Sequence, residues 1–98
     1  MSTLSQWCAV DFVSLRVVDW DGEFTVFQPA AGKTHFLNEM GMQVLILLDQ
    51  SPATLERLCQ LLAERFSLLL DESFMQQIQQ TLRRFEALGL VASVNPSQ

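Results

Sequence analysis

The chain has 98 residues, of which 49% are hydrophobic, and it carries eleven acidic against six basic residues for a net charge of −5. This length and composition are typical of one globular domain with its own core, and they exclude intrinsic disorder. The acidic balance lacks the basic footprint of a nucleic-acid binder, and no apolar run approaches the ~20 residues of a membrane span. Because Met1–Gln6 is polar and uncharged, we expect no signal peptide and a cytoplasmic location.

Residue types that carry catalysis or bind metals are scarce. Cys8 and Cys59 are the only cysteines and His35 is the only histidine, so neither a disulfide framework nor a metal site is expected. Gly32-Lys33-Thr34 lacks the upstream glycine of a phosphate-binding loop and is better explained as a turn glycine followed by strand residues. We therefore expect no catalytic residues and no cofactor, and the chain is predicted not to be an enzyme.

The first half of the chain shows strand patterns separated by turn signals. Branched valines favour a strand over Val13–Val18, the Asp-Gly pair within Trp20–Glu23 predicts a hairpin turn, and a second strand follows over Phe24–Phe27. Gly32 permits the turn into a short third strand, Lys33–Leu37. These strands would form an antiparallel meander in which the third is an edge, with a row of backbone groups open to another strand.

The second half has the patterns of three helices. The first is apolar on nearly every face over Met40–Leu48, and Gly41 within it indicates the close approach of a neighbouring element. The other two carry one apolar stripe each, and Gly89 is placed to end the third in a left-handed conformation. Leu90–Val94 has the composition of a short final strand. The expected caps are Asn38 for the first helix, Ser51 or Thr54 for the second, and Asp71 or Ser73 for the third.

This order of elements predicts an α+β, winged-helix-like fold: a three-stranded antiparallel meander followed by three helices. We expect an N-terminal segment over residues 1–12, a single domain over 13–94 and a tail over 95–98.

The third helix allows two interpretations. Its polar face is rich in Gln and Arg, which can read base edges, but a net charge of −5 favours a solvated face. Alternatively, Met75 and Leu82 border the apolar stripe beside Gln79 and Arg83, and this border next to the open strand edge would make a groove for an extended peptide. Taken singly, Met75 and Leu82 also fit an ordinary core. The polar face comprises Gln76, Gln77, Gln79, Gln80, Arg83 and Arg84.

The motifs at the junctions of these elements resemble those of the PqqD-like proteins, the peptide chaperones or leader-peptide recognition elements (RiPP recognition elements) of peptide-modification pathways. The resemblance covers about Val13 to Val94, and the Thr34-His35 pair is similar to the subgroup found alongside a kinase related to HPr kinase. It rests on Trp20–Glu23, Pro29–Asn38, Leu55–Leu58 and Phe85–Val91.

The resemblance implies a non-catalytic adaptor that captures a leader or precursor peptide as an added strand along Lys33–Leu37. The adaptor would present the peptide to a peptide-modifying enzyme or to the HPr-kinase-related kinase. His35 and Leu37 are expected to face inward, and Thr34 and Phe36 outward. The implied peptide contacts are Lys33, Thr34, His35 and Phe36 on the strand and Met75, Gln79, Leu82 and Arg83 on the third helix.

Two alternatives to a peptide adaptor remain at this point. One is a winged-helix DNA-binding protein, although no nucleic acid is expected from the charge. The other is a structural subunit that forms a homodimer through its edge strand.

Overall fold

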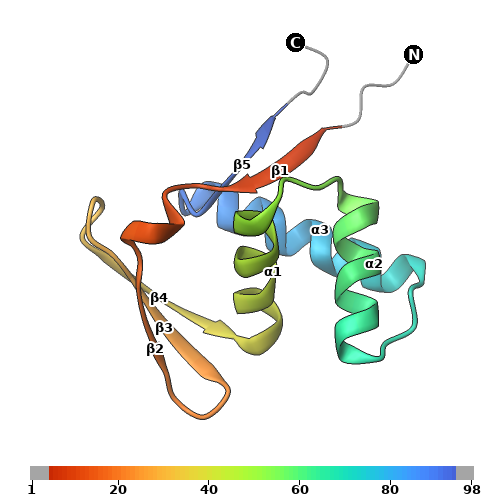
Figure 1. The fold of residues 1–98 in the computed structure, drawn as a ribbon, viewed down its shortest axis with the longest axis horizontal. Coiled ribbons are helices and arrows are strands. Elements are labelled where there is room, and N and C mark those ends of the chain that lie inside the picture. The colour runs from red at the N-terminus through yellow and green to blue at the C-terminus, as the bar shows by residue number, and fades with distance from the viewer. Residues whose placement is uncertain (1–4, 95–98) are drawn as a thin grey trace.

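The computed structural model describes residues 5–94 and confirms the predicted α+β, winged-helix-like fold (Figure 1). A meander of β2, β3 and β4 is followed by α1, α2 and α3. The expected tail over residues 95–98 and the first four residues of the N-terminal segment lie outside the described residues. In chain order the elements are β1 (Gln6–Ala9), a 3₁₀-helix (Phe12–Ser14), β2 (Arg16–Asp19), β3 (Glu23–Gln28), β4 (Lys33–Asn38), α1 (Glu39–Gln50), α2 (Leu55–Phe66), α3 (Glu72–Ala87) and β5 (Val91–Val94).

The hairpin between β2 and β3 forms where the Asp-Gly pair predicted it. Asp21 and Gly22 have φ values of 61° and 96°, and two positive φ angles in succession make the type I′ turn that suits a two-residue hairpin. β3 then pairs antiparallel with the whole of β4. Because the strand order is β2-β3-β4, β4 is an edge of this sheet, as predicted.

The chain before β2 differs from the predicted pattern. The strand expected over Val13–Val18 begins only at Arg16, because a 3₁₀-helix precedes it and leaves Val13 88% exposed. The pattern predicts no element before residue 13, yet β1 lies there and pairs with β5. Trp7 also exchanges backbone hydrogen bonds with Ala53, at 2.7 and 3.0 Å. These partners are distant in the sequence, so local composition does not reveal β1.

Side-chain caps begin each α-helix and resolve the two alternatives that the sequence left open. Asn38 accepts the capping hydrogen bond of α1 at 2.8 Å, as expected. Thr54 rather than Ser51 caps α2, and Asp71 rather than Ser73 caps α3. In each case a side-chain oxygen satisfies a backbone N–H that the helix itself leaves unpaired.

The end of α3 is a Schellman turn around Gly89. This glycine has a φ of 80°; its N–H donates to the C=O of Glu86 at 3.0 Å, and the N–H of Leu90 donates to the C=O of Phe85 at 2.9 Å. The turn sends the chain directly from α3 into β5.

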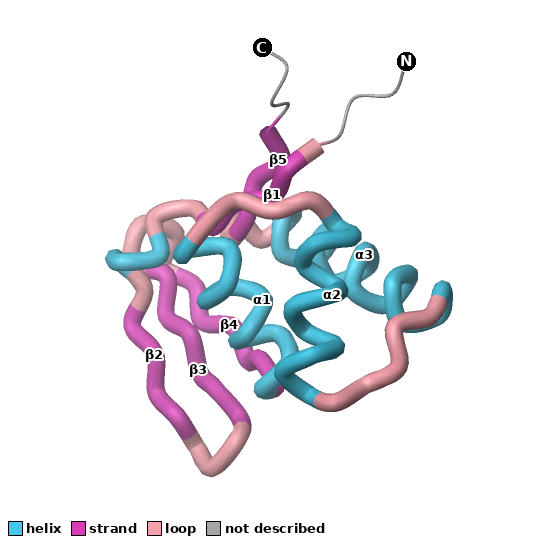
Figure 2. The backbone as a smooth tube through the Cα atoms, turned by 45° about the vertical axis from the view of Figure 1, so that its right-hand side comes forward, coloured by secondary structure: helices cyan, strands magenta, loops and turns pink. Residues whose placement is uncertain are grey.

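α1 lies between the meander and α2, and α3 packs against α2 (Figures 1 and 2). Half of α1 is buried, which agrees with a central helix that is apolar on nearly every face. Within residues 5–94, no helix is both long enough and apolar enough to cross a membrane. The fully buried side chains at the centre of the core are Val26, Val44, Leu45, Leu58, Cys59, Leu62, Ile78, Leu82, Phe85 and Leu90.

The absence of a side chain at Gly41 lets the end of α3 come close to the start of α1. A Cβ at this position would lie 3.1 Å from the ring of Phe85 and 3.3 Å from the capping oxygen of Asn38. This confirms the close approach that a glycine in an apolar helix indicated, and it identifies the neighbour as an aromatic side chain.

We expect Gly41→Ala to lower the free energy of unfolding by about 1 kcal/mol. Alanine favours a helix by up to about 1 kcal/mol, but Phe85 is fully buried and Asn38 is held as the cap, so overpacking costs about 1–3 kcal/mol. Urea unfolding followed by circular dichroism measures the difference. Asp49→Ala, on the exposed side of α1, is the control and should change stability by less than about 0.5 kcal/mol. A more stable Gly41→Ala variant would contradict this packing.

Candidate functional site

The outer edge of β4 carries backbone groups that no strand of the described chain pairs with. The N–H of Trp20 donates to the C=O of Glu23 at 2.6 Å, so the backbone of Glu23 faces β2. Successive residues of a strand direct their backbone groups to alternate sides, so the next residue of β3 faces β4 and pairs with Leu37. The same alternation along β4 places the N–H and C=O groups of Thr34 and Phe36 on the open edge.

The side chains of β4 alternate between the core and the solvent. His35 and Leu37 are 9% and 4% exposed and lie in the core, whereas Thr34 and Phe36 are exposed, Phe36 by 77%. This confirms the orientation expected from the sequence. The side chains of a strand added along β4 would therefore alternate between the outer face of the sheet, beside Phe36, and the side of α3.

A groove of about 210 Å³ lies between the end of β4 and α3. On its helix side are Gln77, Thr81 and Arg84, whose spacing puts them on one side of α3. The guanidinium carbon of Arg84 lies 5.5 Å from the centre of the Phe85 ring, a cation–π distance. This β4–α3 groove is therefore polar and cationic along the helix. Its lining residues are Phe36, Leu37, Asn38, Met40, Gly41, Gln77, Thr81, Arg84 and Phe85.

The margin of α3 that lines the groove differs from the predicted one. The predicted margin comprised Met75, Gln79, Leu82 and Arg83, and none of these lines the groove. Leu82 is fully buried in the core, Met75 and Gln79 are half-buried, and Arg83 is exposed. The apolar stripe of a helix has two margins, and periodicity does not tell which one lies beside the sheet, because that depends on the turns that connect the helices. Two residues of the margin that lines the groove, Gln77 and Arg84, belong to the Gln- and Arg-rich polar face, and together with Thr81 they are spaced i, i+4 and i+7. This pattern does not indicate that they lie beside the sheet.

The four predicted strand residues have different surroundings. Phe36 lines the groove, Lys33 and Thr34 are exposed along β4, and His35 is buried. Thr34 can therefore offer edge backbone groups to a partner, while the side chain of His35 contacts the protein's own interior.

His35 joins β4 to the end of α3 through a chain of hydrogen bonds. Its Nε2 lies 2.9 Å from Oε1 of Gln28, which requires the imidazole hydrogen to be on Nε2, and Nε2 of Gln28 donates to the C=O of Gly89 at 3.4 Å. Burial lowers the pKa of His35, and the nearby charges of Lys33 and Arg84 lower it further. The neutral imidazole is therefore the form that the fold favours.

These features define a winged-helix-like α+β domain with one open strand edge beside a groove on its third helix. The family model of coenzyme PQQ synthesis protein D (PqqD) matches residues 23–91, so the chain belongs to the PqqD family. The structure of TbiB1 in complex with the TbiA(beta) leader peptide has the same fold, with a TM-score of 0.66 and 15% identity over 86% of this chain and 93% of that chain. No curated protein matches the sequence.

We expect the free energy of unfolding to decrease as the pH falls from about 7.5 to about 5.5. Folding holds the pKa of His35 below its ordinary value of 6.5, so the unfolded chain takes up the proton first and is favoured at the lower pH. The stabilisation is fully present above pH 6.5 and is lost as the pH falls towards the folded-state pKa. Urea unfolding at several pH values measures this slope. His35 is the only histidine, so His35→Gln should flatten the dependence of stability on pH. A wild-type protein whose stability does not change over this pH range would contradict the lowered pKa of His35.

Proposed function

We propose that this protein is a peptide-binding adaptor, which captures a leader or precursor peptide as an added strand along β4 and presents it to a modifying enzyme. The observation that carries the proposal is the open edge of β4, where the backbone groups of Thr34 and Phe36 point away from the sheet. An extended peptide pairs with such an edge through its own backbone. Membership of the PqqD family and the leader peptide in the TbiB1 complex support a ligand of this class.

Backbone pairing alone would give weak binding. Thr34 and Phe36 together offer two N–H donors and two C=O acceptors at the edge. Each hydrogen bond contributes about 1 kcal/mol net, so these groups support only about millimolar affinity. Tighter binding requires peptide side chains in the β4–α3 groove, where Gln77 and Thr81 can exchange hydrogen bonds and Arg84 can donate to a carbonyl or a carboxylate.

The modifying enzyme is the second partner in this proposal. The Thr34-His35 pair, which is similar to the subgroup found alongside an HPr-kinase-related kinase, favours that kinase as the enzyme served. The adaptor itself supplies binding and orientation, and it requires no cofactor for either.

Homodimerisation through the edge of β4 is the rival that uses the same surface. A second copy paired there would exclude the peptide, so the apparent affinity for peptide would fall as the protein concentration rises. DNA binding would instead use the exposed Gln76, Gln80 and Arg83, and the net charge of −5 opposes it.

Thr34→Pro tests strand addition directly, because proline removes the one N–H that Thr34 presents at the edge. The probe is a peptide selected on the wild-type protein from a random display library, and its Kd is measured by isothermal titration calorimetry. We expect Thr34→Pro to weaken binding by about 5- to 100-fold, because it removes one hydrogen bond and leaves a carbonyl group of the peptide without its donor.

Thr34→Val is the matched control, since it keeps the N–H and the branched Cβ and should bind like wild type. The unfolding midpoint of both variants is measured alongside. Unchanged peptide affinity in a folded Thr34→Pro protein would rule out pairing at this edge. Concentration-dependent dimers that dissociate in Thr34→Pro, with no peptide selected, would favour the homodimer.

Arg84→Gln and Arg83→Gln form a second matched pair, because the two arginines are adjacent in the sequence but only Arg84 lines the groove. We expect Arg84→Gln to change the Kd of the selected peptide by about 3- to 10-fold and Arg83→Gln to change it by less than about twofold. A larger effect of Arg83→Gln than of Arg84→Gln would instead indicate that the peptide contacts the margin of α3 with Met75 and Leu82. If both variants bind duplex DNA more weakly than the wild type and neither changes the affinity for the peptide, the DNA-binding alternative is favoured.

A further inference from the structure

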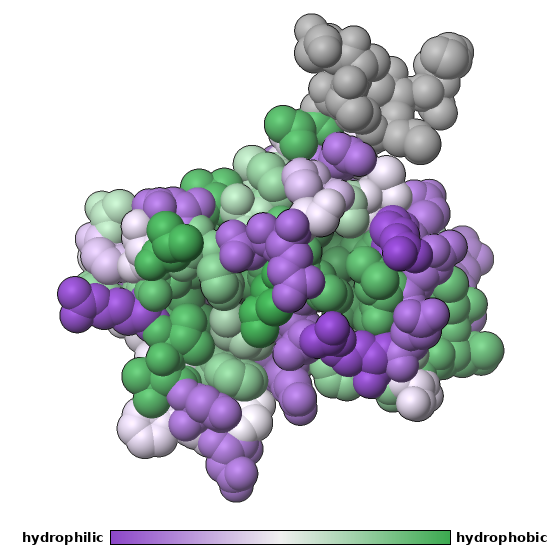
Figure 3. Space-filling model, in the orientation of Figure 1, coloured by the Kyte–Doolittle hydropathy of each residue, from purple (hydrophilic) through white to green (hydrophobic). Residues whose placement is uncertain are grey.

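The outer face of the meander, which is turned away from α1, exposes a group of apolar side chains. Trp20 is 64% exposed and Phe36 77%, values far above those of the core. Figure 3 shows apolar side chains gathered over the meander, with hydrophilic ones at the tip of the β2–β3 hairpin. From the pairing register, the residues that share this face include Val18, Trp20, Thr25, Phe27 and Phe36.

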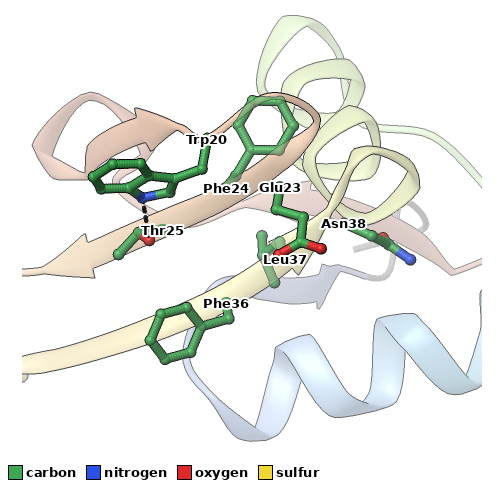
Figure 4. Close-up of a pocket in the computed structure, with 7 residues that line it drawn as sticks. All are labelled: Trp20, Glu23, Phe24, Thr25, Phe36, Leu37 and Asn38. Carbon is green, nitrogen blue, oxygen red and sulfur yellow. Dashed lines mark hydrogen bonds between the residues drawn. The ribbon is translucent and has the colours of Figure 1, made fainter.

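A pocket of about 510 Å³ opens on this face, beside β4. Figure 4 shows the indole of Trp20 beside Thr25 and the ring of Phe36 against β4, on the side away from Trp20. The indole N–H donates to Oγ1 of Thr25 at 2.8 Å, which orients the ring and occupies its only donor. Both rings therefore offer π surface. The lining residues of this outer-face pocket are Trp20, Glu23, Phe24, Thr25, Phe36, Leu37 and Asn38.

The charge at the outer-face pocket is negative. Glu23 is the one charged residue that lines it, and Figure 4 shows the Glu23 carboxylate over the pair of strands β3 and β4. A carboxylate attracts a cation, and so does the face of an aromatic ring. Both therefore favour a side chain that carries a cation at the end of an apolar methylene chain.

The geometry points to a Lys or Arg side chain of the captured peptide as the occupant of the outer-face pocket. This inference rests on the proposed strand addition, which brings a peptide backbone to within about 4.8 Å of β4. A peptide residue that faces the outer side then lies beside Phe36, and a side chain as long as Lys or Arg can reach diagonal neighbours across the strands. Its neighbours in the peptide face the opposite side, towards Arg84.

The opposite charges that line the outer-face pocket and the β4–α3 groove make the preference specific. A basic residue is attracted by Glu23 on the outer face and repelled by Arg84 in the β4–α3 groove. The peptide class that fits is therefore one with a Lys or Arg at a single outer-face position, next to residues that are neutral or acidic.

The test uses peptides selected from a random display library on the wild-type protein and, in parallel, on Glu23→Gln. We expect peptides selected on the wild type to be enriched in Lys or Arg at one position, and those selected on Glu23→Gln to lack this enrichment. Replacing that Lys or Arg by norleucine should weaken binding to the wild type by about 3- to 10-fold and to Glu23→Gln by less than about twofold. Asp21→Asn is the matched control, because Asp21 belongs to the same turn but does not line the pocket, and it should behave like the wild type.

The indole N–H signal of Trp20 gives a second readout by nuclear magnetic resonance. It should shift with the selected peptide and shift less with the norleucine analogue, while Trp7, the only other tryptophan, serves as an internal control. Selected peptides without a basic position, or a norleucine effect of equal size in Glu23→Gln, would overturn the inference. If either result is found while Thr34→Pro still loses peptide binding, strand addition at β4 remains supported and only the inference about the basic side chain is wrong. Selection of no peptide at all would overturn both.

Discussion

The distance between α3 and the junction of β4 with α1 is set where the backbone of Gly41 meets the ring of Phe85. Neither partner is free to move: Phe85 is fully buried, and the N–H of Gly41 donates to the capping oxygen of Asn38. Phe85 is positioned in turn by the Schellman turn at the end of α3, which connects this helix directly to β5 and in which the N–H of Leu90 donates to the C=O of Phe85. Gly41 and Phe85 also line the β4–α3 groove, so the width of the groove depends on a contact inside the core rather than on the groove's own polar residues.

In the proposed binding mode, different groups of the peptide provide affinity and selectivity: its backbone pairs with the edge of β4, and its side chains alternate between the two faces of the sheet. The edge groups of Thr34 and Phe36 would pair with any extended backbone, whatever its side chains. Selectivity would come from the two faces, where the groove carries Arg84 and the outer-face pocket carries Glu23. A slip of one residue would exchange the two sets of peptide side chains and bring like charges together, so these opposite charges would also fix the register of the peptide.

The sequence predicts the meander, the three helices and the open edge of β4 because each depends on local signals: an Asp-Gly turn, apolar periodicity, and capping residues. It does not predict β1, whose partners Ala53 and β5 are remote along the chain. The strand half of the candidate site follows from alternation, so the inward His35 and outward Phe36 are predicted correctly. The helix half does not, because which margin of α3 lies beside β4 depends on the path of the chain through the two preceding turns, and a period of 3.6 residues contains no information about that path.

The pairing of β1 with β5 has a consequence for how the domain can be used. Gln6 lies opposite Val94, so the described chain begins and ends at one corner, and the β2–β3 turn lies on the opposite side of the molecule (Figure 1). An enzyme fused to either end by a flexible linker would therefore leave the edge of β4 and the outer face uncovered. Such a tether typically gives a millimolar effective concentration, so even a weakly held peptide would be delivered efficiently to an active site on the same polypeptide.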